Sequence, residues 1–249
     1  MTTATANFTQ TSTSKPTTQS LMNMLARISG VLYLIIIVGG IYAGFARMEL
    51  LIPGDATATA ANIVASEGVL RSAILADLAM IISDVAIGVM FYMLFKAVNL
   101  TLSLLSAFFR LAQATALGLN LLVLFLALQF AGGAEYLSVF NSGQLDAAAT
   151  LMLSIHGTGY QLALVFFVFS ILIQGYLIMK SGFLPKWLGA IVIVAAVAYF
   201  VDSFAAFALS NYADYADTLA TMLVAIALPV ELILALWLLI RGINTDVLE

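Results

Sequence analysis

The 249-residue sequence contains no cysteine and very little charge. The absence of cysteine excludes disulfides, thiolate metal sites and iron–sulfur clusters. Charged residues make up 9% of the chain and hydrophobic residues 63%, whereas soluble proteins carry roughly 25% charged residues. So little charge cannot hydrate the surface of a protein of this size, and most of that surface must therefore contact lipid. A soluble enzyme is excluded.

Basic residues and the common cofactor motifs are also missing. The chain has 9 Lys and Arg against 13 Asp and Glu, a net charge of −4, whereas nucleic-acid binding needs a basic surface. It contains no ATP-binding loop, Gly-rich dinucleotide turn or HExxH pair. We therefore expect no nucleic-acid partner and no cofactor.

Histidine is nearly absent too, since His156 is the only one. A lone histidine cannot supply both axial ligands of a b-type haem, and a zinc site here would have to borrow acids such as Asp77 or Asp202. We expect no metal site. Instead, the sequence favours His156 at the outer membrane surface, hydrogen-bonded to one of those acids.

Six long apolar stretches separated by short polar breaks predict an all-α bundle of six transmembrane helices. A helix needs about 20 residues to cross the hydrocarbon core, and the ~10-residue alternating strands of a membrane barrel are absent. The predicted spans are 29–46, 73–97, 103–131, 157–179, 187–210 and 218–240. Residues 144–156 predict an extra amphipathic turn at the surface. Pro53-Gly54 predicts a turn, followed by a short Ala-rich helix on the outer surface.

The distribution of basic residues predicts the orientation. If the amino terminus is cytoplasmic, that side receives most of them, namely Lys15, Arg27, Lys96, Lys180, Lys186 and Arg241. The opposite side receives only Arg47 and Arg71, so both termini are expected to be cytoplasmic. Residues 1–24, rich in Thr and Ser, predict a disordered tail. Residues 25–243 form the membrane domain, and 244–249 a short C-terminal tail.

Four ionisable side chains lie deep in the predicted spans, namely Asp84, Arg110, Asp202 and Glu231. Such groups cost several kcal/mol unless they are paired, protonated or hydrated, so they mark a candidate site. Counting 1.5 Å per residue from the cytoplasmic end of each span makes Arg110 and Glu231 the best match in depth, with Asp84 the alternative partner of Arg110. Three acids against one arginine leave two negative charges that a proton or a cation must neutralise.

Polar residues also form a ridge along one face of the third predicted span. Its members are Ser103, Ser106, Arg110, Gln113 and Asn120. Asp77 and Asp84, seven residues apart, share a face of the second span. The ridge and this face predict polar contacts inside the bundle.

The leading hypothesis is a protein that handles a proton, an ion or a small solute between the second, third, fifth and sixth spans. Arg110 would be the fixed countercharge, with Glu231 and Asp84 as exchangeable carboxylates. Asp77, His156 and Asp202 would form the outer access. Two alternatives remain open. One is a structural or regulatory membrane module whose polar groups only fix helix packing, and the other is an intramembrane enzyme acting on a lipid or quinone. Membrane lipid is an expected partner in each case, and the oligomeric state is left open.

Short motifs run in order along residues 24–243. They are Arg27-Ile-Ser-Gly30, Pro53-Gly54-Asp55-Ala56, Lys96-Ala-Val-Asn99, Phe108-Phe109-Arg110 and Ser181-Gly-Phe-Leu-Pro-Lys-Trp-Leu-Gly189, with Asp84, Asn120, His156, Asp202 and Glu231 between and after them. In these residues the chain resembles the bacterial integral membrane proteins catalogued as domain of unknown function 4386. The resemblance implies several helices in the bacterial cytoplasmic membrane and no assigned reaction, so no catalytic residue is transferred.

Overall fold

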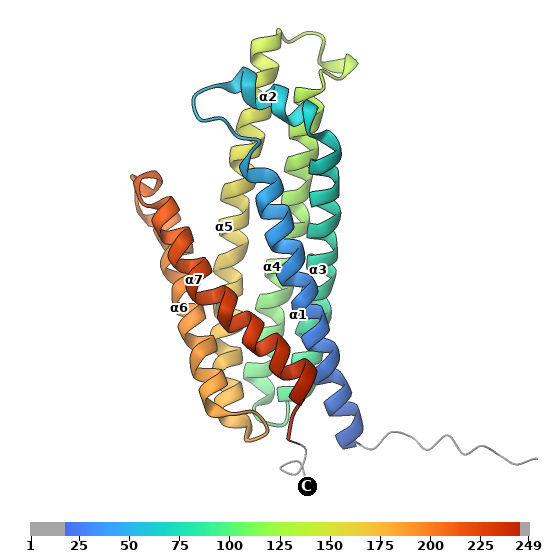
Figure 1. Cartoon of the computed structure of the whole chain (residues 1–249), viewed down its shortest axis with the longest axis vertical. Helices are drawn as coiled ribbons and strands as arrows, with labels where there is room; N and C mark the ends of the chain where they lie inside the picture. Colours follow the sequence, from blue (N-terminus) through green and yellow to red (C-terminus); the bar gives the residue numbers. More distant parts are fainter. Residues whose placement is uncertain (1–17, 245–249) are drawn as a thin grey trace, which may run out of the picture.

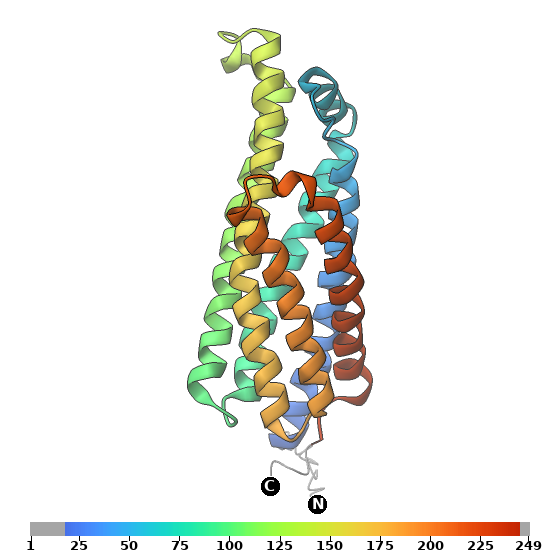
Figure 2. The same ribbon diagram turned by 90° about the vertical axis from the view of Figure 1, so that its left-hand side faces the viewer.

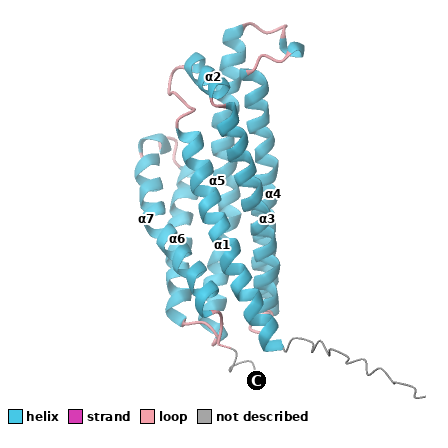
Figure 3. Cartoon of the chain, turned by 45° about the vertical axis from the view of Figure 1, so that its right-hand side comes forward, coloured by secondary structure: helices cyan, strands magenta, loops and turns pink. Residues whose placement is uncertain are grey.

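A computed structural model describes residues 18–244 of the chain. This part folds into helices joined by short turns and contains no strand (Figure 3). Six helices are long and apolar enough to cross a membrane. They are α1 Thr18–Met48, α3 Glu67–Phe95, α4 Leu100–Ala131, α5 Ser142–Ser181, α6 Lys186–Ala208 and α7 Ala216–Leu236. The predicted all-α bundle of six membrane helices is confirmed, and the protein is a multi-pass membrane protein.

The six helices form a closed ring in chain order. Each of α1, α3, α4, α5 and α6 packs against the next long helix, and α7 packs back against α1 (Figure 1). With an even number of spans, the first residues of α1 and the last residues of α7 lie at the same end of the bundle (Figures 1 and 2). Which membrane side this end faces stays a prediction from the basic residues.

Polar caps explain where several helices begin. The side chain of Asn99 accepts a hydrogen bond from the amide of Leu102 and starts α4. Asn141 and Gln144 form a reciprocal capping box at the start of α5. Because a capping side chain satisfies amides that lack a helical partner, it fixes the first turn of the helix.

The short helix α2, Ala56–Ala65, follows the Pro53-Gly54 turn, as the sequence predicts. Gly54 has a positive φ of 79° at this turn, a conformation that glycine adopts without strain. Two further short elements, η1 Glu135–Leu137 and η2 Tyr212–Asp214, lie in the turns at the same end of the bundle as α2. A π-helical turn, η3 Trp237–Arg241, follows α7.

Two predicted boundaries are wrong. Helix α5 begins at Ser142, so residues 144–156 belong to it and form no separate surface turn. Ala149 and Leu153 in this part of α5 pack into a buried cluster with residues of α2. Polar residues in the same segment, such as Gln144, Asp146 and Ser154, lower its hydropathy and hide the helix from a hydropathy reading. Helix α1 begins at Thr18, so residues 18–24 are helical and not part of a disordered tail. The remaining tail predictions, residues 1–17 and 245–249, lie outside the described residues.

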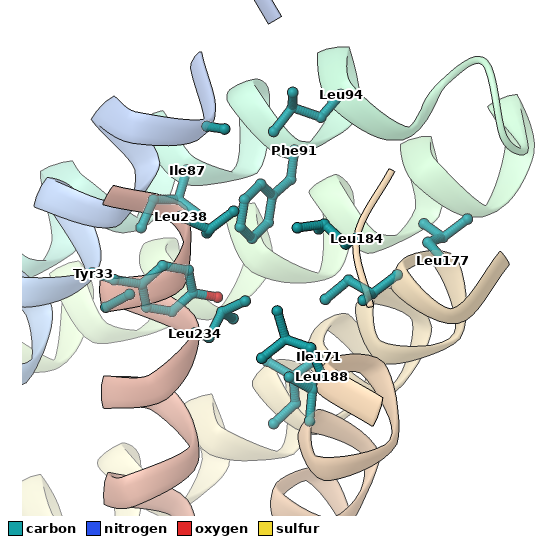
Figure 4. Close-up of a cluster of buried hydrophobic side chains, with 14 of the residues drawn as sticks. Tyr33, Ile87, Phe91, Leu94, Ile171, Leu177, Leu184, Leu188, Leu234 and Leu238 are labelled. Atoms are coloured by element: carbon teal, nitrogen blue, oxygen red, sulfur yellow. The ribbon is translucent and has the colours of Figure 1, made fainter. Parts of the chain in front are cut away.

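The core has two larger hydrophobic clusters and a small third one, formed by Met80, Leu117 and Ala163. The largest cluster lies in the half of the bundle that contains the chain ends and joins α1, α3, α5, α6 and α7 (Figure 4). The second cluster joins α2, α3, α4 and α5 with Leu50, which directly follows α1. It lies in the region where α2, α4 and α5 extend beyond the turn between α6 and α7 (Figure 2). The interior between these clusters contains the polar side chains described next.

Candidate functional site

The polar ridge on α4 points into the bundle. All five of its members are buried, namely Ser103, Ser106, Arg110, Gln113 and Asn120. The hydroxyls of Ser106 and Ser170 on α5 each donate to the other residue's carbonyl oxygen at 2.9 Å. The side-chain amide of Asn120 donates to the carbonyl oxygen of His156 at 2.8 Å. Because these bonds replace water as a partner for polar groups, they fix α4 against α5.

Arg110 pairs with Asp84 on α3. Its Nε donates to Asp84 Oδ1 at 2.9 Å, and its Nη2 lies 2.7 Å from the same oxygen. The side-chain amide of Gln113 donates to Asp84 Oδ2 at 3.0 Å. Both charged residues are only 1% exposed. Pairing by depth favoured Glu231 as the partner of Arg110, and this is wrong; the alternative partner, Asp84, makes the contact.

Tyr33 and Gln174 extend this polar group to α1 and α5. Arg110 Nη1 donates to Tyr33 Oη at 3.1 Å, and the amide of Gln174 donates to the same oxygen at 3.2 Å. The guanidinium carbon lies 5.1 Å from the centre of the Tyr33 ring and 5.2 Å from that of Phe167, a cation–π geometry. Figure 4 shows the hydroxyl of Tyr33 pointing into the surrounding cluster. Arg110 thus connects four helices.

Glu231 on α7 has a different environment. Tyr199 on α6 donates its hydroxyl to Glu231 Oε1 at 2.8 Å. Within residues 18–244 the ion pairs join Arg47 to Asp77, Arg71 to Glu67 and Arg110 to Asp84, so none involves Glu231. This carboxyl group therefore has a neutral partner in place of a cation.

Two small internal cavities lie beside these groups, each of about 10 Å³. One is lined by Glu231 and Tyr33 together with apolar residues of α5, α6 and α7. The other is lined by Arg110 and Gln174 with three serines, Ser103, Ser106 and Ser170. A volume of about 10 Å³ accommodates about one water molecule. Tyr33 lines the first cavity and is hydrogen-bonded to Arg110 and Gln174, which line the second.

Asp202 lies in a second polar cluster toward the opposite end of the bundle from the chain ends. Its two oxygens accept hydrogen bonds from Tyr212 Oη at 2.8 Å and from the amide of Gln161 at 3.0 Å. Tyr212 lies outside the membrane spans in η2, where burial and its hydrogen bond to Asp202 raise its pKa to about 12. Asp202 therefore joins α5, α6 and the turn after α6.

The expected hydrogen bond between His156 and Asp77 or Asp202 is not formed. Asp77 instead pairs with Arg47 at the end of α1, at 2.5 Å between Oδ2 and Nη1. Asp202 has the partners given above, and the His156 ring lies 6.5 Å from the ring of Tyr160. His156 and Asp77 are both buried, at 5% and 2% exposure. The long side chain of Arg47 reaches back from the helix end and pairs with Asp77 in place of His156.

Sequence reasoning missed the neutral partners, above all Tyr33, Gln174, Gln161 and Ser170. A single amide inside an apolar run, as at Gln174, is a signal that would have found it, because such groups also need buried partners. No three His, Asp or Glu side chains in the described part of the chain converge to hold a metal ion.

Comparison with known proteins gives a family but no activity. The chain is similar to an uncharacterised protein of Archaeoglobus fulgidus, with 28% identity over 163 residues, which are 65% of this chain and 78% of that protein. No solved structure matches this chain. Residues 28–242, which include nearly all of the six spans, match the family described as domain of unknown function DUF4386. The chain belongs to this family.

Proposed function

We propose that the protein is a proton-handling membrane protein in which Glu231 gains and loses the proton. The observation that carries this proposal is the contrast in partners between the deep charges. Arg110 is bonded to Asp84, whereas Glu231 accepts a hydrogen bond from Tyr199 and forms no ion pair with any residue from 18 to 244. A carboxylate in a membrane span without a cation beside it costs several kcal/mol, and binding a proton removes that cost because it neutralises the group.

The sequence leaves a proton, an ion or a small solute open as the ligand, and the small size of the cavities favours the proton. Each cavity beside Glu231 or Arg110 has a volume of about 10 Å³, room for about one water molecule and far less than the ~300 Å³ of a small-molecule pocket. A proton moves along hydrogen bonds and single water molecules, whereas a solute needs an open site.

The polar groups form a discontinuous line from Glu231 toward the end of the bundle that contains the chain ends. It runs from Glu231 across the first cavity to Tyr33, then through Gln174 and Arg110 to the second cavity and Ser103 near the start of α4. In this arrangement Arg110 and Asp84 are a fixed, neutral pair, and Asp84 is no longer an exchangeable carboxylate. The roles of Asp77, His156 and Asp202 in outer access remain expectations from the sequence.

Proton movement into sealed liposomes tests the proposal. The purified protein is reconstituted with a pH-sensitive dye inside, and a potassium diffusion potential drives protons inward. We expect inward flux with the natural chain and flux at the level of empty liposomes with Glu231→Gln. Asp217→Asn is the matched control, because Asp217 is an exposed acid at the far end of the same helix. Equal flux through the natural chain and Glu231→Gln would overturn the proposal.

The packing alternative draws on the polar ridge of α4. Its bonds join α4 to α3 and α5 and are well formed without any moving group. This alternative predicts that Glu231→Gln also lowers the melting temperature in detergent, whereas the proton proposal predicts an unchanged melting temperature.

The enzyme alternative has less support. An apolar groove of 340 Å³ lies between α6 and α7 and is bordered by Asp202, but this carboxylate already accepts two hydrogen bonds.

The location follows the same reasoning from charge. The basic residues Arg27, Lys96, Lys180, Lys186 and Arg241 lie at the end of the bundle where α1 begins and α7 ends. We assign this end to the cytoplasm by the positive-inside rule. The bacterial cytoplasmic membrane is proposed only from the resemblance to the family. A cysteine placed at Lys96 should then react with impermeant maleimide only in inverted vesicles.

A further inference from the structure

Basic side chains gather at the end of the bundle that contains the chain ends, and no carboxylate of residues 18–244 pairs with them. The five basic residues at this end are absent from the ion pairs formed within residues 18–244, which involve Arg47, Arg71 and Arg110 only. No Asp or Glu occurs from Leu177 to Tyr199, or from Leu232 to Asn244. Among residues 18–244, the charged side chains of the turn between α5 and α6 and of the end of α7 are therefore all basic.

This end of the bundle contains a pocket of 340 Å³ between the α5–α6 turn and the segment after α7. Gly182, Pro185, Trp237 and Arg241 contribute to its lining. The segment after α7 is held in place, because the amide of Asn244 donates to the carbonyl oxygen of Phe183 at 2.9 Å. Its volume is within the range of ligand pockets, about 300–1,000 Å³.

The two tryptophans of the chain meet at the same place. The rings of Trp187 on α6 and Trp237 on η3 pack edge to face, 5.5 Å apart. Trp187 is 49% exposed and follows Lys186 in the sequence. Tryptophan favours the headgroup level of a bilayer, where its ring is apolar and its N–H is hydrated. The pair therefore puts the pocket at the level of lipid headgroups.

We propose that this pocket binds the headgroup of an anionic phospholipid, with Arg241 holding the phosphate and the Trp187–Trp237 pair lying against the glycerol and upper acyl chains. Arginine presents a planar set of donors that matches two phosphate oxygens. Basic pockets at membrane level recognise anionic headgroups in this way. The site is separate from Glu231 and does not depend on proton handling.

Because the chain has no other tryptophan, its fluorescence reports this site directly. The protein is reconstituted in phosphatidylcholine bilayers that contain increasing amounts of brominated phosphatidylglycerol or brominated phosphatidylcholine, and quenching gives the relative affinity of the two lipids. We expect a preference for phosphatidylglycerol of about fivefold or more. Equal quenching by the two lipids overturns the proposal.

Variants separate the pocket from general surface charge. Arg241→Gln should abolish the preference, whereas Lys180→Gln should keep it, because Lys180 is a basic residue at the same end that does not line the pocket. If Arg241→Gln fails to insert, Arg241→Lys, which keeps the charge but loses the paired donors, should show a reduced preference. Equal losses with Lys180→Gln and Arg241→Gln would overturn the site. So would full competition by inorganic phosphate at matched ionic strength, which would indicate an anion site and not a lipid site.

Discussion

The α3–α4 side and the α6–α7 side of the bundle each hold a carboxyl group inside the membrane, but they stabilise it differently. On the first side Asp84 pairs with Arg110, and four further polar or aromatic side chains surround the pair. On the second side Glu231 accepts a hydrogen bond from the hydroxyl of Tyr199 and has no ion-pair partner in the described part of the chain. The comparison teaches that one side is built as a fixed, neutral unit and the other as a group that a proton can leave or join.

The two sides also differ in how their helices are joined. Asp84, Arg110, Tyr33 and Gln174 connect α1, α3, α4 and α5 through charged and neutral hydrogen bonds. Helix α7 contains Pro229 two residues before Glu231, and a proline inside a helix removes one backbone hydrogen bond and bends it. Motion of Glu231 is therefore easier to accommodate than motion of Asp84.

The largest expected effect is on the paired side. Arg110→Gln leaves Asp84 buried without its cation, which lowers the free energy of unfolding by about 3–5 kcal/mol. Denaturant titration in detergent measures this loss. The double variant Arg110→Gln with Asp84→Asn should recover much of it, because no buried charge remains. Arg71→Gln, in an exposed pair with Glu67, is the control and should change stability by less than about 1 kcal/mol. If Arg110→Gln and Arg71→Gln lower the free energy of unfolding by similar amounts, the pair of Asp84 and Arg110 is not a stabilising unit.

A close helix contact provides the next largest effect. A Cβ atom on Gly189 of α6 would lie 2.5 Å from the carbonyl oxygen of Gly175 on α5. Gly189→Ala should therefore separate α6 from α5 and lower stability by about 1–3 kcal/mol. It should also displace Tyr199 and thus reduce proton flux, while the pairing of Arg110 with Asp84 is unaffected.

Gly118→Ala provides the control, since the added Cβ would meet no side chain and no other helix within 4 Å and the residue is in the middle of α4. Its stability should be equal to that of the natural chain or slightly higher. If Gly189→Ala lowers stability but leaves proton flux intact, the position of Tyr199 does not matter for Glu231.

A smaller effect on stability, which depends on pH, is expected at Tyr212. Because burial and the bond to Asp202 raise its pKa to about 12, against about 10 in the unfolded chain, folding favours the neutral phenol. Its contribution is complete below pH 10 and is lost as the pH rises from 10 to 12. Tyr212→Phe should be less stable than the natural chain at pH 8 by about 1 kcal/mol, and the difference should shrink above pH 10. Melting curves across this range measure it, and a difference that is constant with pH would contradict it.

Sequence predicted the spans and the α4 ridge better than the pairing within the site. Long apolar runs and the one-face spacing from Ser103 to Asn120 are local properties, so they could be predicted directly. The partner of Arg110 depends on how helices tilt and where they begin. Counting depth from each end treats every helix as upright, whereas α7 crosses the bundle obliquely (Figure 1). Depth alone therefore could not separate Asp84 from Glu231.

The burial of His156 and the pairing of Arg47 could not be predicted from local sequence either. His156 was placed near the surface because its span was predicted to begin at 157, whereas α5 begins at Ser142 and buries it. Arg47 served in the sequence only as a marker of orientation, yet it forms the ion pair with Asp77. The contacts of a long side chain at a helix end depend on neighbouring helices, which no local pattern specifies.

The smallest expected change in stability is at Glu231 itself. Replacing its carboxyl group by the amide in Glu231→Gln retains an oxygen that accepts the hydrogen bond from Tyr199, and it removes a charge that has no cation partner. The free energy of unfolding should change by less than about 1 kcal/mol, with any gain arising from the lost desolvation cost. Asp84→Asn, the same chemical change on the paired side, leaves Arg110 without its anion and should cost several kcal/mol. Denaturant titration of the two variants compares the sides directly. Equal losses would mean that Glu231 is also part of the fixed structure, and the proton would then have no separate site in the bundle.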